Sequence, residues 1–177
     1  LLVLLVVFLP HVEALNIFGE TRVRKFPQLD EDTMAELVAD GGKRLLRTYK
    51  PGRYLWGGED ASCRFFCSSK SVMKNVGPIE KGTRWTIERR GDNQVAFRAG
   101  NGKYLSDGTT PWMGVVDLEE DGDDWMLWTP VKNDDGSFSF HSDRTKFGWL
   151  SAHRTDVLVV TVDEKSTCEK FWLEPWP

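Results

Sequence analysis

A stretch near the middle of the chain decides the fold: Val95-Ala96-Phe97-Arg98, a glycine at Gly102, and then Tyr104-Leu105. Two short apolar runs separated by glycine predict a pair of β-strands joined by a tight turn. Related copies occur once before and once after it. Each copy has an aromatic residue followed by leucine, shortly after a glycine, and these pairs are Tyr54-Leu55, Tyr104-Leu105 and Trp149-Leu150.

A second signature lies between the copies and consists of an aromatic residue, a spacer and an aliphatic residue. It reads Trp85-Thr86-Ile87, Trp125-Met126-Leu127 and Phe171-Trp172-Leu173, with 40 residues between the first two aromatic anchors and 46 between the last two. Each unit also holds one further apolar run, at Phe65-Phe66, Val115-Val116 and residues 157–160.

Three units of four strands predict an all-β protein, because repeats of this kind bury their apolar faces only against one another. We predict a β-trefoil, a six-stranded barrel capped by three hairpins around a pseudo-threefold axis. A β-propeller is excluded because three blades are too few to close. Side chains alternate between the two faces of a strand, so the repeated large residues are predicted to face inward. They are Leu55, Trp85, Leu105, Trp125, Leu150 and Phe171.

The composition predicts a single globular domain that binds rather than catalyses. The chain has 177 residues, of which 40% are hydrophobic and 28% charged, and its net charge of −4 argues against a nucleic-acid partner. Eight Trp and ten Phe can fill a core, whereas three His and three Cys offer few nucleophiles or soft metal ligands. We therefore expect no enzyme, no cofactor and no metal site.

The first 40 residues differ in texture from the repeats. Residues 1–14 read as the end of a secretory signal peptide with cleavage after Ala14, and a buried N-terminal strand is the alternative. The apolar run is too short to span a bilayer, so we expect no stable membrane insertion. Residues 15–40 form an extension with a short helix, capped by Asp30 or Asp32 and ended by Gly41-Gly42. The trefoil is then expected over residues 41–177.

Export would place three cysteines in an oxidising environment. An odd number allows at most one disulfide and leaves one thiol. The sequence leaves the pairing open: Cys63 and Cys67 are close enough to close a short hairpin, and either one is also a partner for Cys168.

Several runs resemble the fascin-like β-trefoils of the actin-crosslinking superfamily. They are Gly82-Thr83-Arg84-Trp85-Thr86-Ile87-Glu88, residues 97–106 and Asp135-Gly136-Ser137-Phe138-Ser139-Phe140, and the likeness extends over roughly Lys43 to Glu174. The resemblance implies the trefoil fold, since the matching residues are core and turn positions. Fascins carry several such domains in tandem in the cytosol, whereas this chain has one copy and an export-like N-terminus, so no actin-contact residue is transferred.

Two groups of residues are candidates for binding. Three loops follow the aromatic-leucine pairs and offer carboxylates beside Trp or His, a mixture typical of saccharide sites. Their candidate ligand-binding residues are Trp56, Glu59, Asp60, Asp107, Trp112, His153, Arg154 and Asp156. A basic patch, Lys43, Arg44, Arg47, Lys50 and Arg53, contains five cations and no acid and favours an anionic partner.

Together these features predict a secreted, non-enzymatic binding protein whose ligand is an extracellular glycan or protein. Two alternatives stay open. One is an actin-binding fascin-like module, and the other is a cytokine-like or protease-inhibitor trefoil that acts on a protein partner through one protruding loop.

Overall fold

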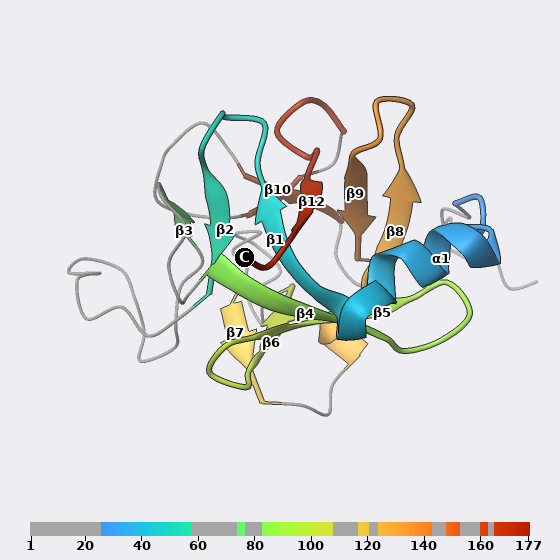
Figure 1. Ribbon diagram of the computed structural model, residues 1–177, viewed down its shortest axis with the longest axis horizontal. Helices are drawn as coiled ribbons and strands as arrows, with labels where there is room; N and C mark the ends of the chain where they lie inside the picture. Colours follow the sequence, from blue (N-terminus) through green and yellow to red (C-terminus); the bar gives the residue numbers. More distant parts are fainter. Residues whose placement is uncertain are drawn as a thin grey trace, which may run out of the picture.

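The computed structural model describes residues 26–57, 74–76, 83–107, 117–120, 124–142, 148–152, 160–162 and 165–177 (Figure 1). Within these ranges the chain forms one α-helix, two short 3-10 helices and many short strands. The helices are α1 (Glu31–Val38), η1 (Ala39–Gly42) and η3 (Asp124–Met126). The strands are β1 (Lys43–Arg47), β2 (Tyr54–Trp56), β3 (Lys74–Val76), β4 (Arg84–Arg89), β5 (Val95–Ala99), β6 (Tyr104–Ser106), β7 (Asp117–Glu119), β8 (Thr129–Lys132), β9 (Phe138–His141), β10 (Trp149–Ser151), β11 (Val160–Val162) and β12 (Trp172–Pro175).

Six of the strands close into a ring of antiparallel neighbours. Strand β1 pairs with both β4 and β12, β4 pairs with β5, and β8 pairs with β9. Two isolated bridges complete the ring, Val95 to Trp128 between β5 and the start of β8, and Phe138 to Phe171 between β9 and the start of β12. The order β1-β4-β5-β8-β9-β12 therefore returns to β1 and forms a barrel.

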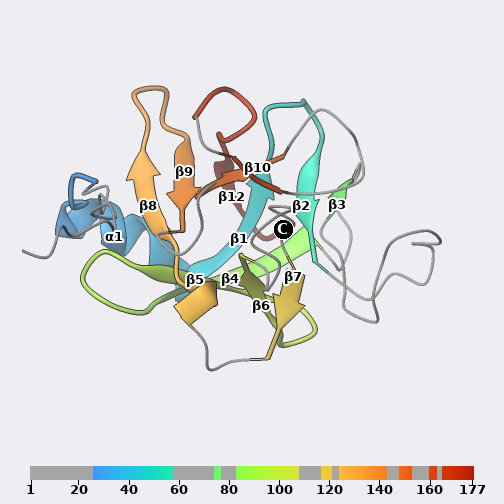
Figure 2. The ribbon, with the colours of Figure 1, turned by 180° about the vertical axis from the view of Figure 1, so that it is seen from behind.

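The other six strands form three hairpins, β2-β3, β6-β7 and β10-β11. Figures 1 and 2 show β2 beside β3 and β6 beside β7 from both sides of the molecule. Each hairpin joins the barrel through one register pair, and the three pairs are Arg47 with Tyr54, Arg98 with Tyr104, and His141 with Trp149. A closed six-stranded barrel with three equivalent hairpins is the predicted β-trefoil.

The strand registers define which residues are equivalent in the three repeats, and they correct one core assignment. Trp85, Trp128 and Phe171 occupy the same position, 43 residues apart in each step, and each is 0% exposed. Trp125 was predicted to take this place but is only half-buried. The prediction was wrong because η3 precedes β8, so the apparent strand motif at Trp125 belongs to a helical turn.

The two buried indoles are also held by hydrogen bonds. Trp85 Nε1 donates to the Leu55 carbonyl and Trp128 Nε1 to the Leu105 carbonyl, each at 3.1 Å. Gly57 lies against the Trp85 ring, since a Cβ at this position would come within 2.6 Å of the indole. The predicted inward positions at Leu55, Leu105 and Leu150 are confirmed, because each is 0% exposed.

Helix α1 adds to the core at one end of the barrel. Asp30 caps it, since Oδ1 accepts from the Thr33 backbone N–H at 2.8 Å, and Met34 and Leu37 pack into the barrel core. The buried Arg44 guanidinium donates to the Glu36 carbonyl at 2.8 Å, near the end of the helix. The predicted helix and its Asp30 cap are therefore present.

Several sequence predictions fall outside the described residues. They concern the signal peptide at residues 1–14, the apolar runs at Phe65-Phe66 and Val115-Val116, and the thiols of Cys63 and Cys67. Cys168 is buried and forms no disulfide with any residue that the structure describes. No helix in the described ranges has the length and hydropathy needed to cross a membrane.

Candidate ligand-binding face

One outer face of the barrel combines indole rings with cations. Strands β12, β1 and β4 run side by side there, with Arg47 opposite Trp172 and Leu45 opposite Glu174 and Arg84. Neighbouring residues such as Leu46 point to the core, so the alternate residues point outward. We call six of these residues the indole–cation face: Lys43, Arg47, Arg84, Trp172, Glu174 and Trp176.

Half of this face is built around Trp172. The Arg47 guanidinium lies 4.7 Å from the centroid of the Trp172 ring, and Arg47 Nε donates to Glu174 Oε1 at 2.5 Å. Tyr54 Oη donates to the other carboxylate oxygen at 2.9 Å. Burial, and next the bond to Glu174, raise the pKa of the Tyr54 phenol above its ordinary value of 10.0. The Glu174 carboxylate thus fixes the Arg47 guanidinium, which stacks on the Trp172 ring.

The other half is built around Trp176. Its Nε1–H donates to the Arg44 carbonyl at 2.9 Å, which fixes the half-buried ring against β1. Lys43 Nζ lies 5.6 Å and Arg84 Cζ 5.7 Å from the ring centroid, within the range of cation–π attraction. Lys43 and Arg84 are exposed, and neither forms an ion pair with an acidic side chain in the described ranges.

The second repeat contains the same Arg–Glu–Tyr arrangement, which identifies it as part of the fold. Arg98 Nε donates to Glu88 Oε1 at 2.7 Å, and Tyr104 Oη donates to Glu88 Oε2 at 3.0 Å. These are the same atoms in the same roles as in the first repeat. We infer that this triad attaches a hairpin to the barrel, so the triad alone does not mark a binding site.

Trp172, in contrast, is peculiar to its repeat. The residue opposite Arg98 is Thr86, and the residue opposite His141 is Thr129, at the positions equivalent to Trp172. The same backbone therefore accepts threonine twice, and closing the barrel does not require a half-exposed indole at this point.

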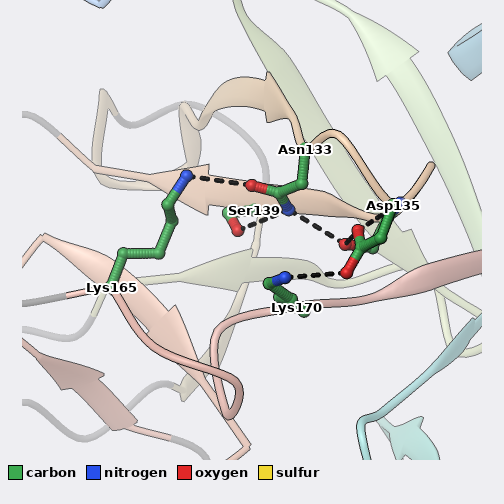
Figure 3. A network of polar contacts seen from close by, with 6 residues as sticks. Asn133, Asp135, Ser139, Lys165 and Lys170 are labelled. Carbon is green, nitrogen blue, oxygen red and sulfur yellow. Dashed lines mark hydrogen bonds and ion pairs between the residues drawn. The ribbon is translucent and has the colours of Figure 1, made fainter.

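The third repeat satisfies its polar groups internally at the place equivalent to Trp176. Lys165 Nζ donates to Asn133 Oδ1 at 2.9 Å, and Lys170 Nζ donates to Asp135 Oδ2 at 2.7 Å. Figure 3 shows both contacts. Lys170, followed by hydrogen bonds from Ser137, holds the pKa of the Asp135 carboxyl well below its ordinary value of 3.8. Both lysines thus have acceptors within the chain, whereas the part of the chain that the structure describes offers Lys43 and Arg84 no acidic partner.

The position of the Arg–Glu–Tyr triad is occupied by aromatic rings in the third repeat. His141, 7% exposed, and Trp149 lie with ring centroids 4.8 Å apart, and Phe26 packs against them at 4.5 and 5.0 Å. In the second repeat Arg90 stands at the place equivalent to Trp176, and its Nη2 donates to Glu88 Oε2 at 2.9 Å. Of the three equivalent faces, the first thus combines two half-buried indoles with exposed cations that lack a described acidic partner.

The predicted loop site is only partly described. Trp56 is half-buried at the end of β2, and Asp107 is 1% exposed at the end of β6, where its N–H donates to the Trp125 carbonyl at 2.9 Å. Asp107 is therefore buried rather than displayed at the surface. The remaining predicted ligand residues are outside the described ranges, and they are Glu59, Asp60, Trp112, His153, Arg154 and Asp156.

The five cations of the predicted basic patch do not share one surface. Lys43 and Arg47 belong to the indole–cation face, whereas Arg44 is 8% exposed and bonds to backbone carbonyls. Lys50 and Arg53 are half-buried on either side of the turn between β1 and β2.

Sequence reasoning missed the other four residues of the face, Arg84, Trp172, Glu174 and Trp176. Trp172, Glu174 and Trp176 alternate with Phe171 and Leu173, a pattern that signals one outward edge of a strand. Their approach to Lys43 and Arg47 depends on the pairing of β12 with β1, which spans more than 120 residues. Separately, no group of His, Cys, Asp and Glu in the described ranges is arranged to hold a metal ion.

Comparison with known proteins adds structural relatives only. No protein-family model and no curated protein matches the chain. A designed threefold-symmetric protein, ThreeFoil, matches 75% of this chain and 97% of its own length with a TM-score of 0.59 and 17% identity. The chain is a β-trefoil.

Two larger proteins contain a similar unit. A mosquitocidal holotoxin matches 76% of the trefoil chain with a TM-score of 0.62 and 15% identity, over 17% of the toxin. A GlcNAcα1-4Gal releasing endo-β-galactosidase from Clostridium perfringens matches 76% with a TM-score of 0.59 and 16% identity, over 32% of that enzyme. The trefoil chain thus spans less than a third of each of these proteins, and at such identity the likeness shows the fold alone.

Proposed function

We propose that this chain is a secreted, non-enzymatic β-trefoil that binds glycans through the indole–cation face. The observation that carries the proposal is the half-exposed indole of Trp172, held under Arg47 at a position where the barrel elsewhere has threonine. A side chain that the fold does not require is available for a ligand.

The chemistry of the face suits a saccharide. Sugar rings present C–H surfaces that pack on aromatic rings, and their hydroxyl groups need donors and acceptors nearby. Trp172 and Trp176 supply the aromatic surface. Arg47 keeps guanidinium N–H groups beyond its Nε–H, which alone bonds to Glu174, and an arginine stacked on an indole is already ordered before a ligand arrives.

One structural relative, a glycosidase, supports a saccharide ligand for this chain. One similar unit makes up 32% of a GlcNAcα1-4Gal releasing endo-β-galactosidase. A trefoil that accompanies such an enzyme is consistent with a binding role, and our proposal extends that role to this chain.

A glycan array followed by calorimetry of the best oligosaccharide tests the proposal. We expect Trp172→Ala to weaken binding at least tenfold. Thr86→Ala provides the matched control, because Thr86 occupies the equivalent position in the second repeat, and it should leave affinity within twofold. Equal affinities of the two variants, or no bound glycan on a broad array, would reject a saccharide site on this face.

Secretion and the absence of catalysis are parts of the same proposal. We expect the mature protein to begin after Ala14, which mass spectrometry of material from an exporting host measures directly. Retention of residues 1–14 would contradict export. The non-enzymatic role rests on the design of the face, which combines stacking surfaces with a carboxylate already bonded on both oxygens.

An actin-binding role is the second candidate, favoured by the fascin-like runs around Trp85, Tyr104 and Phe138. A single trefoil needs two actin sites or self-association to crosslink filaments. Co-sedimentation with filamentous actin distinguishes actin binding from glycan binding. A protein that binds only glycans should stay in the supernatant. A protein partner bound through one loop, as in cytokine-like or protease-inhibitor trefoils, would instead appear as a co-purifying chain.

A further inference from the structure

The geometry points to an acidic saccharide as the ligand of the indole–cation face, one that carries carboxylate or sulfate groups; this inference rests on the proposed glycan-binding function. Among the six residues of the face, three are cations and one is an acid. Glu174 binds Arg47 with an Nε–Oε1 distance of 2.5 Å, so no acidic side chain in the described ranges compensates the charges of Lys43 and Arg84.

The two uncompensated cations share one ring. Lys43 Nζ and Arg84 Cζ lie 5.6 and 5.7 Å from the Trp176 centroid, and they reach it from neighbouring strands, β1 and β4. These distances are at the outer limit of cation–π attraction, so both groups can turn toward a ligand at little cost. An anionic group beside the indole would gain hydrogen bonds and ion pairs from both.

The equivalent places in the other repeats show what a compensated arrangement looks like. In the third repeat Lys170, which is equivalent to Arg84, has its Nζ 2.7 Å from Asp135 Oδ2 (Figure 3), and in the second repeat Arg90, at the place of Trp176, bonds to Glu88. In both cases the chain supplies the anion. In the first repeat the described chain supplies none to Lys43 or Arg84, and an acidic ligand completes the same pattern.

The rings and the cations have separate roles in this arrangement. Trp176 is fixed by its bond to the Arg44 carbonyl at 2.9 Å, and Trp172 is fixed under Arg47. The indoles therefore offer a surface to the sugar ring whatever its charge, while Lys43 and Arg84 discriminate by charge. Arginine can bind a carboxylate or sulfate with two parallel hydrogen bonds, whereas lysine acts as a point charge.

The test is calorimetry of the intact protein with three hexasaccharides: a sulfated uronic-acid oligomer, an unsulfated uronic-acid oligomer, and a neutral oligomer. We expect at least one acidic oligomer to bind ten times or more tightly than the neutral one in 0.05 M salt. The advantage should fall at least threefold in 0.5 M salt, because exposed charges are screened. The tighter of the two acidic oligomers identifies the acid group.

Two charge-matched double variants localise the effect. Lys43→Gln with Arg84→Gln should weaken binding of the acidic oligomer at least tenfold and leave the neutral oligomer within twofold. The control, Lys103→Gln with Lys132→Gln, removes the same net charge elsewhere, from two surface ion pairs, and should change the affinity less than threefold. Equal losses in the two double variants would overturn the inference, since the attraction would then be a property of overall charge.

Different results reject acid recognition and glycan binding. If neutral and acidic oligomers bind alike and both depend on Trp172, glycan binding stands and acid recognition is rejected. If Trp172→Ala changes the binding of none of the three oligomers, this face is not the glycan site and both proposals are rejected together. Circular dichroism of each variant verifies that it is folded before its affinity is used.

Discussion

Replacing Trp128 by phenylalanine tests the threefold register of the barrel. Trp128 is 0% exposed, and its Nε1 donates to the buried Leu105 carbonyl at 3.1 Å. Phenylalanine keeps most of the ring but has no donor. The equivalent residue of the third repeat is Phe171, so the barrel holds a phenylalanine ring at this position in one of its three repeats.

The expected loss combines two effects. Leaving a buried carbonyl without its donor costs about 1–3 kcal/mol. The space left by the missing part of the indole adds about 1 kcal/mol, because a tightly packed core closes such a cavity only partly. We therefore expect Trp128→Phe to lower the free energy of unfolding by about 2–4 kcal/mol, which corresponds to a fall in Tm on the order of 10 °C.

Urea unfolding followed by far-ultraviolet circular dichroism measures this loss without relying on tryptophan fluorescence. Trp125→Phe is the matched control, since Trp125 lies three residues earlier and is half-buried in η3, and we expect it to cost less than about 1 kcal/mol. The m-value should stay the same in both variants. A larger loss at Trp125 than at Trp128 would refute the register derived from the strand pairing.

Three further predictions concern helix α1, the hairpin attachment and the response to acid. Arg44→Met should lower the unfolding free energy by about 1.5–3 kcal/mol, because the Glu36 carbonyl loses a charged donor. The exposed neighbour provides the control, and Lys43→Met should change the unfolding free energy by less than about 0.5 kcal/mol. Equal shifts of Tm in the two variants would contradict this prediction. Tyr104→Phe should cost about 0.5–1.5 kcal/mol in urea unfolding by removing the bond to Glu88, and an unchanged midpoint would contradict it. Because the pKa of Asp135 is lowered, its ionised form stabilises the fold above pH 4, and this contribution is lost as the pH falls further. Asp135→Asn should therefore lower the free energy of unfolding at pH 7 and make less difference at pH 2. A difference independent of pH would count against the contact with Lys170.

Much of the fold could be predicted because trefoil repeats leave a local signature. Each hairpin begins with an aromatic residue and a leucine after a turn, and Leu55, Leu105 and Leu150 all proved to be buried. The mistake at Trp125 has a local cause as well. Two tryptophans three residues apart, Trp125 and Trp128, precede β8, and the pairing of Val95 with Trp128 identifies the one that faces the core.

The candidate site was much harder to predict, because its residues come from β1, β4 and the segment 172–176, which are far apart in the sequence. Lys43 and Arg47 are close in sequence and were found as cations of a basic patch. Their aromatic partners, Trp172 and Trp176, reach them only when β12 pairs with β1. A sequence shows the alternation within each strand, but the register between two distant strands is set by the packing of the closed barrel.

The most direct test of the account follows the indole N–H signals of the ¹⁵N-labelled protein by NMR during titration with the acidic hexasaccharide that binds best. Variants Trp172→Phe and Trp176→Phe assign the two signals of the face. We predict that these signals shift in proportion to occupancy while those of the buried Trp85 and Trp128 stay in place. Shifts confined to other indoles, with Trp172 and Trp176 unmoved, would contradict the account and place binding elsewhere on the trefoil.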